Sequence, residues 1–360
     1  MNTYGAKLRF TSFGESHGVG VGCVVDGMPS GVRFDDSIIK QKLQKRAGGQ
    51  NKYQTPRKEE DEIIILSGVF EGYTTGTPIA VLVYNQNQKS KDYSDIKDIF
   101  RPAHADFSYF AKYGIRDYRG GGRSSARESV ARVIAGAIAS MLLDELGISV
   151  KSVLCGVGEV DMVGEIDFEH QSGIFAPNKA SEELFKKVLD ETIAAKDSVG
   201  ARVLTYASGV MAGLGEVLYD KLDARIASAF MGLNAVKAVE IGNGVYASHV
   251  KGSQNNDEFV LKNGKIGTST NNHGGILGGI STGEDIIIKT HFKPTPSIFL
   301  EQNTLDINGV SKSVAIKGRH DPCVGVRGGV VLEAMLSFIL ADFVLLNASS
   351  NIKNIKKIYF

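Results

Sequence analysis

Residues 119–146 read RGGGRSSARESVARVIAGAIASMLLDEL, a glycine-rich loop followed by a strongly apolar segment. From Val130 to Leu146 the apolar residues recur at helical spacing and Gly147 follows them, so the pattern predicts a buried helix over 127–146. The three consecutive glycines let the backbone approach a ligand closely. The arginines of the loop can hold a carboxylate or phosphate, and the start of a helix presents free backbone N–H groups. The stretch therefore predicts an anion-binding loop at the N-terminus of a core helix.

Strands and helices alternate along the rest of the chain. Short apolar runs predict strands over 22–26, 63–66 and 79–84. Helical spacing and capping residues predict further helices after Asp35 or Asp36 and over 182–195, 217–230 and 329–346. No segment is rich enough in proline, serine or charge to be a linker. We therefore expect a mixed class, α/β or α+β, in a single domain over residues 1–360.

The composition is that of an ordinary globular protein, with 360 residues of which 42% are hydrophobic and 22% charged. The formal net charge is +1, so nothing global indicates nucleic acid or a membrane surface as a partner, and any anion must be bound by local clusters. No apolar run reaches about 18 residues, which argues against a membrane span. No spacing of His, Cys, Asp and Glu indicates a metal site. The three cysteines lie far apart and the first residues lack a signal-peptide pattern, so we expect a cytoplasmic protein.

Histidine lies beside acidic or basic residues in three short segments: GESHG at 14–18, RPAHAD at 101–106 and GRHDPC at 318–323. Histidine can act as an acid or a base near neutral pH, which makes His17 a candidate catalytic residue. The first segment also matches the G-x-S-x-G nucleophile elbow. Only 13 residues precede Gly14, too few for the strand and oxyanion loop that an elbow needs. A structural role is the alternative for His17 and for His104.

Two more segments carry groups that can bind an anion. Arg46 and Arg57 flank a loop with two adjacent glycines, and a solvated helix end is the alternative. The glycine loop at 271–283 is followed by KPTPS at 293–297, which offers a cation, hydroxyls and N–H groups to a second phosphate or a polar cofactor edge. A turn with a surface lysine is the alternative there. Walker A and Rossmann fingerprints are absent, and one short RGG copy at this net charge argues against an RNA contact.

Six ordered segments together resemble chorismate synthase across nearly the whole chain: 14–18 with 26–29, 101–106, 119–127, 233–242, 271–283 and 318–323. The resemblance implies one large α+β domain, a β-α-β sandwich, that usually assembles as a homotetramer. It also implies trans-1,4 elimination of phosphate from 5-enolpyruvylshikimate 3-phosphate to give chorismate. That reaction requires reduced FMN but causes no net redox change.

The resemblance further implies roles for individual residues. His17 would protonate the leaving phosphate, His104 would stabilise the anionic reduced flavin, and Asp321 would assist proton removal at C6. The residues expected to bind FMN are Arg123, Ser124, Ser125, Asn234, Ala235, Gly278, Lys293, Pro294, Thr295, Pro296, Ser297 and Arg319. Those expected to bind the substrate are Ser16, Arg46, Arg57 and Arg127, and Arg46 also stands where the family contacts NADPH.

The chain departs from the family pattern at a few positions. Lys45 and Lys52 stand where arginine is expected, and His273 where alanine is frequent. An FMN-dependent oxidoreductase acting on an anionic small molecule is the alternative function, and it would oxidise its flavin in step with turnover. An RNA-binding protein would leave the candidate histidines and Asp321 without a role. Whether the chain reduces its own flavin with NADPH or relies on an external reductase stays open, because the family contains both kinds.

Overall fold

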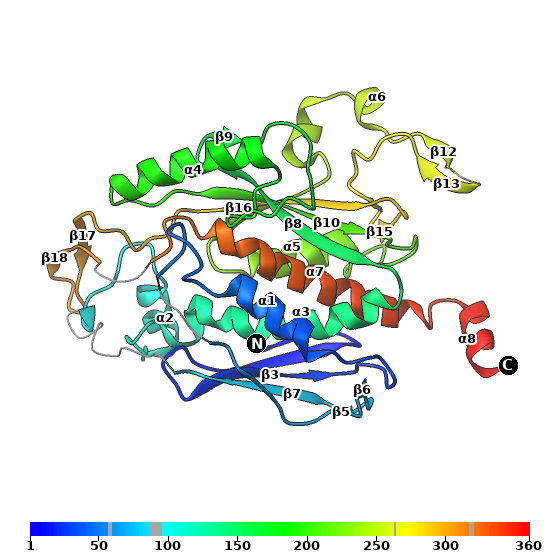
Figure 1. Cartoon of the computed structure of the whole chain (residues 1–360), viewed down its shortest axis with the longest axis horizontal. Helices are drawn as coiled ribbons and strands as arrows, with labels where there is room; N and C mark the ends of the chain where they lie inside the picture. The colour runs from blue at the N-terminus through cyan, green and yellow to red at the C-terminus, as the bar shows by residue number, and fades with distance from the viewer. Residues whose placement is uncertain (57–59, 87–95, 263, 317–319) are drawn as a thin grey trace.

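Two five-stranded antiparallel sheets enclose a layer of helices in the computed structural model of the chain (Figure 1). The structure describes residues 1–56, 60–86, 96–262, 264–316 and 320–360. The arrangement confirms the expected α+β class and the β-α-β sandwich.

The first sheet comes from the N-terminal part of the chain and has the spatial order β1-β2-β3-β7-β4. Its strands are Thr3–Gly5 (β1), Arg9–Gly14 (β2), Gly20–Asp26 (β3), Ile79–Tyr84 (β7) and Ile63–Ile65 (β4). Fully buried residues alternate with more accessible ones along β7, so Ile79, Val81 and Val83 all enter the core on one face. Strands β2 and β3 are joined by the loop that carries His17, and this sheet therefore positions that loop.

The second sheet has the order β11-β16-β10-β8-β9. Its strands are Val236–Ile241 (β11), Ile286–Phe292 (β16), Ala201–Ser208 (β10), Ser149–Val157 (β8) and Val160–Asp161 (β9). Strand β16 buries every second residue from Ile286 to Phe292. It leads directly into the 293–297 segment, which is thus anchored at one end of a central strand.

Four helices lie between the sheets or along their edges (Figure 1): Asp36–Arg46 (α1), Ser129–Asp144 (α3), Leu222–Met231 (α5) and Gly325–Asn347 (α7). Helices α3 and α7 are apolar almost all round and pack along each other. A Cβ atom on Gly136 would lie 2.2 Å from the carbonyl oxygen of Ala334, so the two helix backbones touch at this point. Helix α1 ends at Arg46, and α7 begins shortly after Asp321.

The remaining elements lie outside this core. Helix α4 (Lys179–Ala194) packs on β8 and β9. The other helices are Asp106–Tyr113 (α2), Gly252–Asn255 (α6) and Ile352–Tyr359 (α8), with 3₁₀ turns at Gly122–Ser124 (η2), Ala126–Glu128 (η3) and Gly244–His249 (η4). Among the described residues, four two-stranded hairpins complete the elements: Val69–Phe70 with Tyr73–Thr74 (β5, β6), Phe259–Lys262 with Lys265–Thr268 (β12, β13), Ile276–Leu277 with Ile280–Ser281 (β14, β15), and Gln302–Leu305 with Ser311–Val314 (β17, β18).

The predicted helices are present, but their ends differ from the prediction. The helix predicted over 127–146 begins at Ser129, because two 3₁₀ turns precede it. The helix predicted over 182–195 begins at Lys179, where the Asn178 side chain caps the first turn by accepting from the Ser181 N–H. The helix predicted over 217–230 begins only at Leu222. Apolar periodicity indicates which face is buried, whereas capping and packing set the first turn.

Helix α7 is long and apolar enough to cross a membrane by length and composition, which the sequence reasoning did not notice. Within the molecule, 72% of its most apolar window is buried. That burial is typical of the core helix of a globular protein.

Replacing Gly136 with alanine should destabilise the protein, because the added Cβ would meet the Ala334 backbone and force α3 away from α7. Overpacking of this kind costs about 1–3 kcal/mol. The thermal unfolding midpoint of the variant should therefore fall. Gly252→Ala is the control, since it adds a Cβ to another helical glycine with open space around it. An equal midpoint for the two variants would contradict the close helix contact.

Candidate active site

The glycine-rich loop folds as a left-handed run followed by two tight turns. Residues 120–122 have φ angles of +72°, +85° and +53°, which residues with a side chain rarely adopt. The turns η2 and η3 follow, and the Ser125 hydroxyl accepts a hydrogen bond from the Arg127 N–H. The chain then enters α3. The loop therefore delivers Ser125 and Arg127 at the start of the core helix, as predicted from the sequence.

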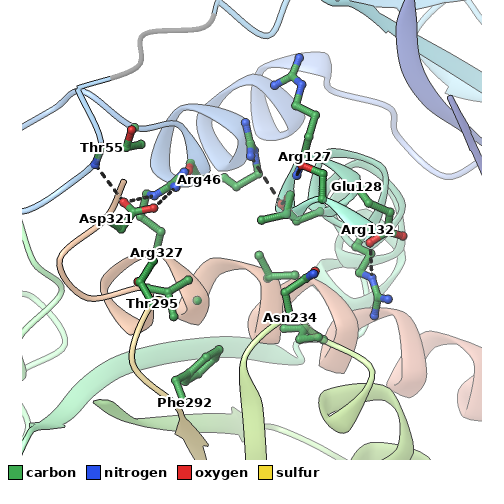
Figure 2. Close-up of a pocket in the computed structure, with 18 of the residues that line it drawn as sticks. Arg46, Thr55, Arg127, Glu128, Arg132, Asn234, Phe292, Thr295, Asp321 and Arg327 are labelled. Atoms are coloured by element: carbon green, nitrogen blue, oxygen red, sulfur yellow. Dashed lines mark hydrogen bonds and ion pairs between the residues drawn. The ribbon is translucent and has the colours of Figure 1, made fainter. Parts of the chain in front are cut away.

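A cavity of about 250 Å³ opens where this loop meets the ends of α1 and α7 (Figure 2). Six predicted binding or catalytic residues line it: Arg46, Ser125, Arg127, Asn234, Thr295 and Asp321. Apolar side chains form part of the wall: Leu233, Phe292, Val324 and Val331. The fold thus gathers segments from positions 46 to 331 around one space. An apolar wall with a few polar and charged groups suits a small anionic ligand.

Asp61 bridges two arginines that line the cavity. Its Oδ2 accepts from Arg46 Nη2 at 2.7 Å and its Oδ1 from Arg127 Nη1 at 2.6 Å. The exposed fractions of the Arg46, Asp61 and Arg127 side chains are only 7%, 3% and 4%. Burial alone would raise the pKa of Asp61, but the two guanidinium groups outweigh burial and hold this pKa below its ordinary value. The carboxylate is therefore charged at neutral pH and orients both arginines.

Asp321 is held in place by Arg327 from the first turn of α7. Arg327 Nε donates to Oδ1 at 3.0 Å, and its Nη2 contacts Oδ2. The Thr55 backbone N–H also donates to Oδ1, at 2.9 Å. Arg327 Nη1 also donates to the carbonyl oxygen of Arg46 at 2.9 Å (Figure 2). Arg327 therefore links Asp321 to the end of α1 that carries Arg46. The carboxylate of Asp321 thus has a fixed orientation.

His17 packs against the glycine-rich loop. Its Nδ1 lies 3.1 Å from the Ser16 hydroxyl oxygen. A Cβ atom on Gly120 would fall 2.4 Å from Cε1 of the imidazole, so glycine at this position leaves the room that the ring occupies. This contact explains one of the three glycines independently of any ligand.

Asn85 fixes the loop of His17 to a cavity arginine. Its Nδ2 donates to the carbonyl oxygens of Glu15 and Gly18, both at 2.9 Å. Its Oδ1 accepts from Arg127 Nε at 3.1 Å. The position of His17 is therefore tied to the position of Arg127.

His104 lies beside the 293–297 segment. Its Nε2 is 2.9 Å from the Ser297 hydroxyl oxygen, and its Nδ1 is 2.9 Å from the carbonyl oxygen of Pro102. Because a carbonyl can only accept, Nδ1 carries the proton and Nε2 accepts from Ser297. Burial lowers the pKa of His104 to about 4, and the positive charge of Arg101 acts in the same direction. The imidazole is therefore neutral at pH 7.

Segments predicted to bind the cofactor contact one another at the edge of the cavity. Asn234 Nδ2 donates to the Ser124 carbonyl at 2.9 Å, and the Lys293 N–H donates to the Ala235 carbonyl at 2.8 Å. Lys293 Nζ donates to the Ala103 carbonyl at 2.8 Å. These bonds bring the 124, 234–235 and 293 positions together, although they are distant in the sequence.

Other predicted residues are not among those that line the cavity: Ser16, His17, His104, Ser124, Ala235, Lys293, Pro294, Pro296 and Ser297. Arg123 points toward β2, where its Nη2 donates to the Ser12 hydroxyl at 2.7 Å, and it lines a second cavity near the N-terminus. Gly278 lies in the turn between β14 and β15. Arg57 and Arg319 fall outside the described residues.

Sequence reasoning missed three side chains that hold the site together: Asp61, Asn85 and Arg327. Asp61 lies two residues before the apolar run at 63–66, and Arg327 lies in the first turn of an almost wholly apolar helix. A charged residue next to such an apolar segment requires a partner where it is buried, and this was the sequence feature that could have identified it. Neither spacing nor composition identifies which partner it is.

Three buried polar atoms at the cavity have no hydrogen-bond partner within the described part of the chain: Arg46 Nε, Thr295 Oγ1 and His320 Nε2. Burial also lowers the pKa of His320 to about 4, and Arg101 adds to this effect. Leaving such a group unsatisfied costs about 1–3 kcal/mol, which a bound ligand would recover. Over the same described residues, no group of three or more His, Cys, Asp or Glu side chains could hold a metal ion.

Buried arginines, an oriented carboxylate and the neutral His320 around one cavity define an enzyme site for an anionic small molecule. The family model described as chorismate synthase matches residues 8–345. The chain belongs to the chorismate synthase family.

Individual relatives agree with this membership. Chorismate synthase of Campylobacter jejuni subsp. jejuni (strain 81-176) is 58% identical over 364 residues, covering 100% of this chain and 99% of the relative. Chorismate synthase of Aliarcobacter butzleri (strain RM4018) is 55% identical, with coverage of 100% and 99%. A crystal structure of chorismate synthase superposes with a TM-score of 0.75 at 29% identity, covering 98% of this chain and 96% of that one.

The protein is accordingly a carbon–oxygen lyase of aromatic biosynthesis that acts on a small-molecule substrate and depends on reduced flavin. It releases phosphate from 5-enolpyruvylshikimate 3-phosphate and forms chorismate. The chorismate synthase activity expected from the six sequence segments is confirmed, and it replaces the alternative of an FMN-dependent oxidoreductase.

The two buried histidines should make the protein less stable as the pH falls from about 6.5 to about 4. An unfolded histidine takes up a proton near pH 6.5, whereas His104 and His320 stay neutral in the folded protein down to about pH 4. The unfolded state therefore binds more protons in this window, and each histidine contributes a slope of up to ~1.4 kcal/mol per pH unit.

Urea unfolding at pH 7 and pH 5 measures this effect. The loss of unfolding free energy between the two pH values should be smaller in the double variant His104→Gln, His320→Gln than in the parent protein. An equal loss in both proteins would show that these histidines are not held neutral.

Proposed function

We propose that His17 donates the proton to the leaving phosphate, that Asp321 assists proton removal at C6, and that Arg46 and Arg127 bind the anionic groups of the substrate. The observation that carries this proposal is the Asn85 bridge, which ties the loop of His17 to Arg127. A phosphate bound by Arg127 would thus be near the proposed acid. Arg57 completes the proposed substrate contacts, together with Ser16 beside the His17 ring.

In the proposed reaction the C6–H bond breaks, its electron pair enters the new diene, and the C3–O bond breaks as phosphate leaves. A C6–H bond without an activating group is difficult to break by acid and base alone. Reduced flavin, when bound, supplies transient electron density to the substrate, which no side chain can do. Arg327 and the Thr55 N–H hold Asp321 in one orientation, and this supports its role in assisting proton removal at C6.

We propose FMN as the flavin, bound by Arg123, Ser124, Ser125, Asn234, Ala235, Gly278, Lys293, Pro294, Thr295, Pro296, Ser297 and Arg319. The unpartnered Thr295 hydroxyl beside the Phe292 wall supports this, because a flavin has a polar edge and a flat face. His104 is neutral in the protein alone, and a neighbouring anion would raise its pKa. This response supports its role beside the anionic reduced flavin.

NADPH is the proposed reductant where the chain reduces its own flavin. Arg46 is the proposed contact for it, as the resemblance implies. The burial of Arg46 and its unpartnered Nε support contact with an anion that enters the cavity. Substrate and NADPH would then compete for this arginine.

We also propose one domain over residues 1–360, assembled as a homotetramer in the cytoplasm. One hydrophobic cluster contains buried residues from both sheets and the helices between them, which supports the single domain. Exposed apolar side chains on the β12–β13 hairpin, with Phe259, Leu261 and Ile266 at 70% to 77% exposure, support an assembly of several copies. The three free buried cysteines fit a reducing compartment.

His17→Ala should lower turnover about a hundredfold or more while reduced FMN still binds, because a general acid contributes on that scale. Anaerobic kinetics with 5-enolpyruvylshikimate 3-phosphate and a flavin titration measure the two effects separately. His249→Ala is the matched control, since His249 is exposed in η4. Near-normal turnover in His17→Ala would remove His17 from the mechanism.

Thr295→Val should weaken FMN binding roughly fivefold, the effect of one lost neutral hydrogen bond. The control is Thr290→Val, because the Thr290 hydroxyl is also buried and unpartnered but lies in β16, outside the cavity lining. A flavin titration of both variants decides the point. Equal affinities would count against a flavin contact at Thr295.

A further inference from the structure

A continuous series of contacts joins the loop of His17 to Asp321, and it passes in order through Asn85, Arg127, Asp61, Arg46 and Arg327. The carboxylate of Asp61 forms the central link. The series connects the loop of the proposed proton donor with the residue proposed to assist proton removal. Asn85 directly follows β7 and Asp61 lies two residues before β4, whereas Arg46, Arg127 and Arg327 belong to α1, η3 and α7.

Each oxygen of Asp61 accepts from a different guanidinium group, so the carboxylate sets the distance between Arg46 and Arg127. Long arginine side chains sample many rotamers unless a partner fixes them. Asp61 itself is not among the residues that line the cavity, whereas both of its arginines are. Any effect of Asp61 on a bound ligand therefore acts through the two arginines.

We propose that Asp61 is a positioning residue of the lyase reaction. It holds Arg46 and Arg127 at the spacing that binds the anionic substrate, and the series of contacts sets this pair between the loop of His17 and Asp321. The inference rests on the proposed role of the two arginines in substrate binding. If Asp61 only neutralised the charge of the two arginines, its replacement would change the stability of the protein alone. If Asp61 positions them, its replacement also changes the KM for the substrate.

Asp61→Asn is the direct test, because it keeps the shape of the side chain and removes its charge. The KM for 5-enolpyruvylshikimate 3-phosphate should rise about tenfold or more, the effect of one disturbed charged hydrogen bond, with a smaller change in kcat. The thermal unfolding midpoint should also fall, since two buried guanidinium groups lose their shared partner.

Asp342→Asn is the matched control. Asp342 is fully buried, pairs with Arg225 at 2.7 Å and accepts from three backbone N–H groups near the N-terminus. It does not line the cavity. Its loss should lower the unfolding midpoint and leave KM unchanged.

A KM that is unchanged or lowered in Asp61→Asn would overturn the proposal. If this variant does not fold, Asp61→Glu replaces it, since the longer side chain keeps the charge and shifts both arginines. An unchanged KM in Asp61→Glu would also overturn the proposal. Arg127→Gln tests the proposed substrate contact separately from the positioning role of Asp61. An unchanged KM in Arg127→Gln would remove the proposed substrate contact itself, whereas a raised KM there with an unchanged KM at Asp61 removes only the positioning role.

Discussion

The direct contact between the backbones of α3 and α7 at Gly136 and Ala334 determines the geometry of the rest of the molecule. Both helices are buried between the two sheets, so neither can move without disturbing the core. Helix α3 begins just after the glycine-rich loop, and α7 begins just after Asp321. The helix contact therefore fixes the distance between the two loops that form the cavity.

Charge is organised locally in a chain whose net charge is only +1. Arginines at the cavity are each held by a carboxylate, as the buried Arg46 and Arg127 are by Asp61 and the partly buried Arg327 is by Asp321. A low-dielectric surrounding strengthens such pairs and keeps their geometry before a ligand arrives. The site can thus bind a polyanion without the cost of arranging its arginines during the reaction.

The sequence predicted the mixed fold, the core helices and six residues around the cavity, because helical periodicity and glycine–arginine loops are local patterns. It did not identify Asp61, Asn85 or Arg327 as parts of the site, since their roles depend on partners distant in the chain. Helix starts were displaced for a similar reason: η2 and η3 and the Asn178 cap are set by packing and local hydrogen bonds. The placement of Arg123 at a second cavity also followed from tertiary contacts alone.

An anaerobic assay tests the central claim most directly. The protein is mixed with 5-enolpyruvylshikimate 3-phosphate and a small amount of chemically reduced FMN, while chorismate absorbance, phosphate release and the flavin spectrum are followed together. The account predicts equal amounts of chorismate and phosphate over many turnovers, with the flavin still reduced at the end. Product formed only in proportion to flavin oxidised would contradict it.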